Sequence, residues 1–181
     1  MSKVTLVKPT IDMKDAALDF LEEFIRENSP MNGFYGLNEM PYEEWLEHIA
    51  KSEAGEIPDR LPSAAFFCVD NDTGVIAGIA NIRYKLIDGH DHLPSYVNGN
   101  LGGSVRPSLR GKGYGAQMLK LSVKKAGEYG NRRVLVACDK WNAASERVIV
   151  KCGGVFDNEI VEQDYNVIRR FWFDVPQDDE R

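Results

Sequence analysis

The feature that most constrains this chain is a glycine-rich run between an expected strand and an expected long helix. It reads Val105-Arg106-Pro107-Ser108-Leu109-Arg110-Gly111-Lys112-Gly113-Tyr114-Gly115-Ala116. An apolar run leads into it, and an amphipathic helix is expected over about residues 113–130. Glycine lets a backbone approach an anion without an intervening Cβ, and a helix start offers unpaired N–H groups and the positive end of its dipole. The run therefore predicts a seat for a phosphate-bearing ligand at the start of that helix.

The charge around this run is the reverse of the charge of the whole chain. The 181 residues carry a net charge of -6, which argues against nucleic acid as the main partner. Between residues 103 and 133, however, the only acid is Glu128, and the cations are Arg106, Arg110, Lys112, Lys120, Lys124, Lys125, Arg132 and Arg133. This local excess of positive charge favours a phosphorylated ligand, although Lys120 and Lys124 are equally typical of a solvated helix face.

The cysteines and the apolar runs bear on the compartment. The three cysteines, Cys68, Cys138 and Cys152, have neither metal-ligand spacing nor a disulfide framework, so we expect buried free thiols and no metal. The N-terminus lacks a signal-like apolar run, and no segment reaches membrane-spanning length. The sequence thus predicts a cytoplasmic protein that does not associate with a membrane.

The first helix is expected to begin at Asp12, which can cap it, and to end at Asn28-Ser29-Pro30. Its apolar residues fall on one face, and they are Ala17, Leu18, Leu21, Phe24 and Ile25. Further along, Gly78 lies inside an expected strand and indicates a bulge.

The order of elements predicts an α+β fold in three layers, with a mixed, largely antiparallel sheet flanked by helices. We expect a single domain over residues 1–175, followed by a flexible acidic tail over 176–181. The expected elements are a strand at 3–8, helices at 12–28 and 42–51, hairpin strands at 64–69 and 75–84, a strand at 101–105, the helix at 113–130, a strand at 133–138, a helix ending near 152, and strands at 155–161 and 166–175.

The order strand, Arg110, two residues, Gly113, one residue, Gly115, helix resembles the acyl-CoA signature of the GNAT superfamily of N-acetyltransferases. The element order is similar to theirs over nearly the whole chain. The resemblance implies a GNAT-like acyl-CoA N-acyltransferase fold with acetyl-CoA as cosubstrate, the strand before the loop pairing with the pantetheine arm and the loop amides binding the pyrophosphate. The residues that it assigns to the cofactor here are Val105, Arg110, Gly111, Lys112, Gly113, Tyr114, Gly115 and Ala116.

A second motif, Asn142 followed by Ser145 and a helix ending in Lys151 and Gly153, is also similar to GNAT enzymes. By resemblance, the Asn142 side chain binds the pantetheine and Ser145 supports the CoA site. Asn142 is equally suited to be a plain helix cap, and both roles can hold together. The chain departs from the pattern at Ile149, where many of these enzymes carry a Tyr that protonates the departing thiolate.

Acetyl transfer to an amine sets the demands on the remaining residues. A primary amine has a pKa of roughly 10 and must lose a proton before it attacks the thioester, and a backbone N–H near Gly103 to Val105 is the natural donor to the oxyanion. His90 and His92 have a suitable pKa for a base, although two exposed loop histidines are the simpler interpretation. The candidate catalytic residues are His92 as base, Tyr165 as acid and Ser104 to orient water or substrate.

The sequence therefore predicts an N-acetyltransferase that moves an acetyl group from acetyl-CoA to a primary amine of a small molecule or peptide by direct attack. A non-catalytic acyl-CoA-binding module is an alternative, because Ile149 cannot donate a proton. A nicotinamide-dinucleotide domain is another, since Gly111, Gly113 and Ala116 spell Gly-x-Gly-x-x-Ala with Asp139 downstream, but most expected strands precede that motif. The oligomeric state is not fixed, and a homodimer is left open.

Overall fold

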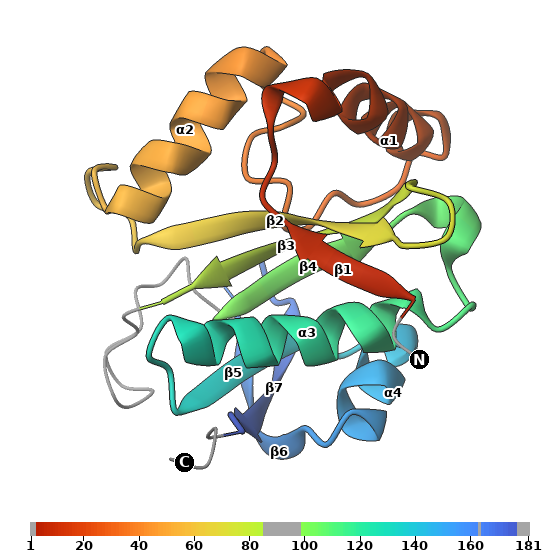
Figure 1. Cartoon of the computed structure of the whole chain (residues 1–181). Coiled ribbons are helices and arrows are strands. Elements are labelled where there is room, and N and C mark those ends of the chain that lie inside the picture. The colour runs from red at the N-terminus through yellow and green to blue at the C-terminus, as the bar shows by residue number, and fades with distance from the viewer. Residues whose placement is uncertain (1–2, 85–98, 163, 177–181) are drawn as a thin grey trace, which may run out of the picture.

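The computed structural model describes residues 3–84, 99–162 and 164–176. The helices and strands of this part of the chain are labelled in Figure 1. In order, they are β1 Val4–Val7, α1 Lys14–Arg26, α2 Tyr42–Ala54, β2 Ser63–Asp70, β3 Ile76–Arg83, β4 Leu101–Val105, α3 Tyr114–Glu128, β5 Arg133–Asp139, α4 Ala143–Lys151, β6 Val155–Val161 and β7 Val167–Asp174.

The strands form one seven-stranded sheet in the order β1-β2-β3-β4-β5-β7-β6. Each neighbouring pair is antiparallel except β4 and β5, which run parallel. Helices α1 and α2 cover one face, and α3 and α4 lie on the other (Figure 1). The predicted three-layer fold with a mixed, largely antiparallel sheet is confirmed, and the parallel doubly wound sheet of a dinucleotide-binding domain is not what these strands form.

The core is divided between the two faces because side chains alternate along each strand. On β2, Phe67 points toward α1 and α2, where it meets Trp45 and Phe20, while Phe66 belongs to the cluster beneath α3. Burying one such aromatic side chain stabilises the fold by about 1.5–3 kcal/mol. Both faces of β2 and β3 are therefore apolar, which explains why these strands read as nearly continuous apolar runs.

The start and the buried face of α1 differ from the prediction. Asp12 lies within a short 3-10 turn, Ile11–Met13, and no side chain caps α1. Leu18 and Ile25 are 42% and 62% exposed, whereas Phe20 and Glu23 are buried. The buried stripe runs through Ala17, Phe20 and Phe24, because the rings of Phe20 and Phe24 pack against Phe34 from the following loop.

The bulge expected at Gly78 is present. The register shifts between Cys68, which pairs with Gly78, and Val69, which pairs with Ile76, so that Ala77 is the extra residue. Among the helices that the structure describes, none has both the length and the apolar composition needed to cross a membrane. The side chain of Val175 is buried at the end of the described chain, and residues 177–181 of the expected tail lie outside the described residues.

Candidate functional site

The glycine-rich run forms an open loop that leads from β4 into α3. A 3-10 turn, Pro107–Leu109, follows β4, and residues 110–113 are exposed. Gly113 is the N-cap of α3 with φ +87° and makes no side-chain capping bond. No atom lies within 4 Å of where a Cβ on Gly113 would be, so glycine is required here for its left-handed backbone rather than for space. The first turn of α3 therefore presents uncapped N–H groups at an accessible surface, as an anion site requires.

A buried ion pair fastens this loop to α1. The Arg106 Nε donates to the Glu23 Oε2 across 2.5 Å, its second terminal nitrogen donates to Asp19 across 2.6 Å, and the Ser108 N–H donates to the Glu23 Oε1 across 2.6 Å. Although burial alone would raise the pKa of the Glu23 carboxyl, the Ser108 N–H and the Arg106 guanidinium hold that pKa below its ordinary value. Glu23 thus stays ionised and fixes the turn that precedes the anion seat, a role that the sequence did not reveal.

Three further side chains of the loop are engaged by the protein itself. Arg110 donates to the hydroxyl of Ser29 at 2.6 Å and to the Val105 carbonyl at 3.1 Å. The Lys112 amine donates to the Ser108 carbonyl at 2.9 Å, and the Tyr114 hydroxyl donates to Asp70 at 2.6 Å. These three side chains, which the sequence analysis assigned to the cofactor, therefore shape the loop by bonding within the protein.

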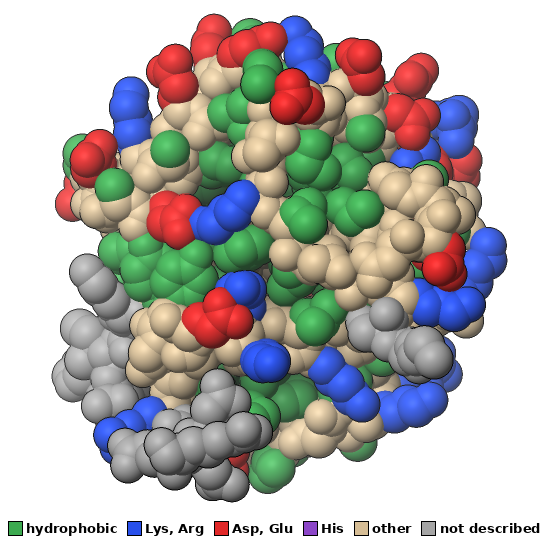
Figure 2. All heavy atoms as spheres, viewed as in Figure 1, with side chains coloured by type: hydrophobic (Ala, Val, Ile, Leu, Met, Phe, Trp, Pro, Cys, Tyr) green, Lys and Arg blue, Asp and Glu red, His purple; other side chains and the backbone are tan. Residues whose placement is uncertain are grey.

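The charge distribution on the surface supports an anion at this side of the molecule. Figure 2 shows acidic side chains gathered over α1 and α2, and Lys and Arg side chains over α3. Burial raises the pKa of the Cys152 thiol, and the positive charges of Lys120 on α3 and Lys151 on α4 oppose that rise.

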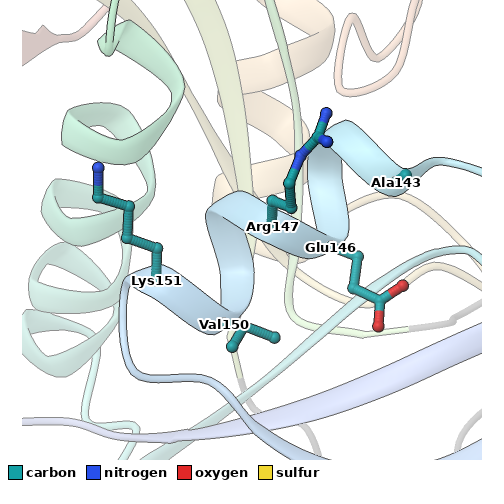
Figure 3. Close-up of a pocket in the computed structure, with 5 residues that line it drawn as sticks. All are labelled: Ala143, Glu146, Arg147, Val150 and Lys151. Atoms are coloured by element: carbon teal, nitrogen blue, oxygen red, sulfur yellow. The ribbon is translucent and has the colours of Figure 1, made fainter.

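Helix α4 meets the start of α3. The Cys152 thiol donates to the Ala116 carbonyl at 3.6 Å. Along the exposed side of α4 lies an open hollow, in which Lys151 extends toward α3 while Val150 points to the opposite side (Figure 3). The lining residues are Ala143, Glu146, Arg147, Val150 and Lys151.

The second motif begins α4. The Asn142 Oδ1 accepts the Ser145 N–H at 3.1 Å, so Asn142 caps the helix as the simpler interpretation expects. The cap uses the oxygen of the amide, and Asn142 is an exposed residue. Ile149 is 4% exposed within the core beneath α3, so this position contributes packing and no proton donor.

Strands β4 and β5 part beside the loop. Asn100 bonds Leu135 twice, through its N–H and its side-chain oxygen, each at 2.7 Å. One further pair, Leu101 with Val136, is in register, and among the described residues the two strands share no pair beyond it toward Val105. This separation leaves the backbone of β4 from Gly102 onward available to an extended ligand between the strands.

The segment between α1 and α2, which includes Asn32 and Gly33, packs against β4. The Ser104 hydroxyl donates to the Asn32 carbonyl at 2.8 Å. A Cβ on Gly33 would lie 2.7 Å from the Gly103 Cα, so only glycine allows this close approach. Ser104, predicted to orient water or substrate, therefore holds this segment against β4.

Of the other catalytic candidates, the structure describes Tyr165 alone. His90 and His92 lie outside the described residues. Tyr165 is 87% exposed in the turn between β6 and β7, with φ +64°. The cysteines are free thiols, and burial raises the pKa of Cys68 to about 12 and that of Cys138 to about 11. In the part of the chain that is described, no group of His, Cys, Asp and Glu is arranged to hold a metal ion.

A buried network of hydrogen-bonded side chains was also not predicted from the sequence. Ser52 donates to the Tyr35 hydroxyl at 2.9 Å and lies 3.0 Å from the Ser63 hydroxyl, which accepts the Asn81 Nδ2 at 3.2 Å. Asn81 is 1% exposed and faces Gly102 of β4 across the sheet. The only sequence signal for this hydrogen-bonded network was Asn81, a single polar residue in the apolar run of β3.

Comparison with known proteins adds a family and a fold. A family model described as an acetyltransferase (GNAT) domain matches residues 3–155. No curated protein is similar enough in sequence to count as a match. Among solved structures, the chain is similar to the microcin C7 self-immunity acetyltransferase MccE in complex with acetyl-CoA and AMP, with 14% identity, coverage of 96% of this chain and 93% of that chain, and a TM-score of 0.69.

Two ribosomal-protein acetyltransferases are similar as well. The Salmonella typhimurium enzyme that modifies the N-terminal serine of L7/L12 has 14% identity, coverage of 97% of each chain and a TM-score of 0.66. RimL, an L7/L12 alpha-N-protein acetyltransferase solved with coenzyme A, has 14% identity, coverage of 97% and 96%, and a TM-score of 0.69. At this level of identity the likeness shows the shared fold.

Proposed function

The chain is a member of the GNAT acetyltransferase family, and on this premise we propose that it transfers an acetyl group from acetyl-CoA to a primary amine of a small molecule or peptide. The observation that carries the proposal is the uncapped start of α3 beside the parting of β4 and β5. The whole of residues 1–175 serves as one catalytic domain, with 176–181 as a tail, and the protein acts in the cytoplasm.

The described residues fit acetyl-CoA. Backbone amides between Arg110 and Ala116 would hold the pyrophosphate, helped by the dipole of α3, although the Arg110 N–H itself donates to the Pro107 carbonyl at 3.2 Å. The separated edge of β4 would pair with the pantetheine arm, and the Asn142 amide, with Ser145 beside it, would reach the same arm. When bound, acetyl-CoA supplies an activated thioester, and the protein orients it.

The residues of the chain must then deprotonate the amine and stabilise charge on the thioester oxygen. Backbone N–H groups of β4 between Gly103 and Val105 that point away from β3 suit the second task, because pairing with β3 holds the strand in place and uses only alternate N–H groups. His92 is our candidate for the base, acting directly or through water. Tyr165 is the candidate acid, since the packing of Ile149 leaves that task to another group.

A peptide N-terminus is the first acceptor to test. Two similar structures are acetyltransferases of the ribosomal protein L7/L12, one of which modifies its N-terminal serine, and the MccE structure supports keeping small-molecule amines in the panel. The family membership favours an enzyme over a non-catalytic acyl-CoA-binding module.

A thermal-unfolding scan with acetyl-CoA, CoA, NAD and NADP tests the cofactor. A ligand at a hundred times its dissociation constant stabilises the protein by about 2.7 kcal/mol, which raises the midpoint by several degrees, roughly 5. We expect this shift with the CoA species alone, followed by acetyl transfer to an amine in a panel read by mass spectrometry. A shift with NAD or NADP alone, or acetyl-CoA binding with no acceptor acetylated, would contradict the proposal.

A further inference from the structure

The guanidinium of Arg110, the first residue of the loop motif, faces away from the anion seat. Its terminal nitrogen bonds the Ser29 hydroxyl at 2.6 Å, its Nε bonds the Val105 carbonyl, and its Cζ lies 5.6 Å from the centre of the Phe24 ring. These three contacts fix the side chain against the end of α1. The backbone of Arg110, which leads into Gly111 and the anion seat, is thereby oriented by a residue outside the motif.

Ser29 is itself held rigidly. Asn28 has φ +45°, and the N–H groups of Asn28 and Ser29 donate to the carbonyls of Ile25 and Phe24 at 3.1 and 2.9 Å. This pattern is a Schellman ending of α1, which fixes the residue that follows the left-handed position. Pro30 comes next and restricts the backbone further. The backbone of Ser29 is thus fixed in a position from which its hydroxyl can accept the hydrogen bond of Arg110.

Residues 29–33 also contact β4, the strand beside which we place acetyl transfer. Four residues after Ser29, Gly33 packs on the backbone of Gly103, and Asn32 accepts the Ser104 hydroxyl. Residues 29–33 therefore bridge the two ends of the cofactor site, the phosphate loop and β4. A change in the loop at Arg110 is connected to β4 through this segment by direct contacts.

We propose that Ser29 is a positioning residue for acetyl-CoA that acts through Arg110, and that the Ser29–Arg110 hydrogen bond transmits the effect of cofactor binding at the loop to residues 29–33. This inference rests on the proposed function of the loop. A hydrogen bond to a charged donor holds a geometry more strongly than a neutral one. Without it the loop amides have more freedom, which CoA must remove on binding, so the affinity falls.

The first test is CoA binding by calorimetry in matched variants. We expect Ser29→Ala to weaken CoA binding about 5-fold and Ser29→Thr, which keeps a hydroxyl, to bind like the wild type. Thr5→Ala, which removes an exposed side-chain bond to Asn71 elsewhere, is the control and is expected to have no effect. In an Arg110→Met background, Ser29→Ala should cause no further loss, because the partner is already absent.

The second readout is amide hydrogen exchange with and without CoA. In the wild type, CoA should slow exchange both at residues 107–117 and at 29–36; in Ser29→Ala the protection at 107–117 should remain and that at 29–36 should be lost. If CoA binds and protects 107–117 but Ser29→Ala binds it equally well, or if the losses add fully in the Arg110→Met background, the inference is wrong and the proposed function stands. If CoA does not bind the wild type, both are overturned.

Discussion

The hydroxyl of Tyr114, the first residue of α3, donates a 2.6 Å hydrogen bond to the carboxylate of Asp70, the last residue of β2. The other oxygen of Asp70 accepts the N–H groups of Asp72 and Thr73 and the hydroxyl of Thr73. One carboxylate therefore organises the hairpin turn and also holds the start of α3. Contacts from Asp70, from Glu23 on α1 and from Ser29 each hold a residue between Ser108 and Tyr114.

The first prediction concerns acid stability and Tyr114→Phe. The hydrogen bond from Tyr114, followed by those from Thr73, lowers the pKa of Asp70 from 3.8 to about 2. Because the folded pKa is depressed, this group contributes stability above pH 3.8 and loses it as the pH falls toward 2. In Tyr114→Phe the Asp70 pKa should rise, so that its contribution is lost at a higher pH. An NMR titration of the Asp70 carboxyl checks this, with Tyr165→Phe as control, and an unchanged Asp70 pKa would contradict it.

The second prediction concerns the buried pair Glu23 and Arg106. The side chains of Glu23 and Arg106 are 6% and 11% exposed, so removing the Glu23 charge leaves the buried Arg106 guanidinium with the largely exposed Asp19 as its ionic partner. Glu23→Gln should lower the free energy of unfolding by about 3 kcal/mol, the lower end for a broken buried pair, because Asp19 still neutralises part of the Arg106 charge, and urea denaturation measures it. Glu23→Leu combined with Arg106→Met should recover part of the loss, because it removes both charges. A loss below about 1 kcal/mol in Glu23→Gln, the value typical of an exposed pair, would show that solvent reaches the pair.

The third prediction separates the two roles of Asn142. Asp caps a helix about as well as Asn, but its carboxylate cannot donate the N–H that a pantetheine carbonyl requires. Asn142→Asp should therefore keep the wild-type unfolding free energy and bind CoA more weakly, whereas Asn142→Ala should lose both, with about 1 kcal/mol of stability. Equal CoA affinity in Asn142→Asp and the wild type would assign Asn142 to the cap alone.

The sequence predicted the elements well where local chemistry decides them. Gly111 and Gly113 have a positive φ that favours glycine, a Cβ on Gly78 would meet the Ser104 carbonyl at 2.8 Å beside the bulge, and the Asn142 side chain accepts the capping bond of α4. The fold class, a mixed and largely antiparallel sheet flanked by helices, followed from the element order and the resemblance to a family and was confirmed. The prediction of the buried face of α1 was partly wrong, because two apolar stripes fit the helical period and packing against Phe34 selects one of them.

The supports of the site could not be predicted in the same way. Arg106 and Glu23 are 83 residues apart, and Arg110 and Ser29 are 81 apart, so nothing local marks them as partners. Glu23 in particular is typical of a solvated helix face in the sequence, and only the packing of α1 on the sheet buries it. Ile149 was recognised as a departure from the family pattern, and its place in the core explains how the chain accommodates the change.

The last prediction uses two glycines with the same backbone to isolate the anion seat. Gly113 and Gly130 have φ of +87° and +85°, and no atom lies within 4 Å of a Cβ at either position. Replacing each by Ala should therefore cost a similar strain, about 1–2 kcal/mol. Gly130 follows α3 at the opposite end from the loop, so Gly130→Ala should bind CoA like the wild type.

Gly113→Ala should weaken CoA binding in addition, because a methyl group enters the surface where the backbone meets the pyrophosphate. Gly113→Glu should abolish binding, since it adds a negative charge at the same place. Calorimetric titration with CoA, alongside urea denaturation of each variant, separates affinity from stability. If Gly113→Glu binds CoA with wild-type affinity, the anion seat lies elsewhere. If Gly113→Ala and Gly130→Ala weaken CoA binding equally, the effect arises from strain in α3, and the direct contact at Gly113 is refuted.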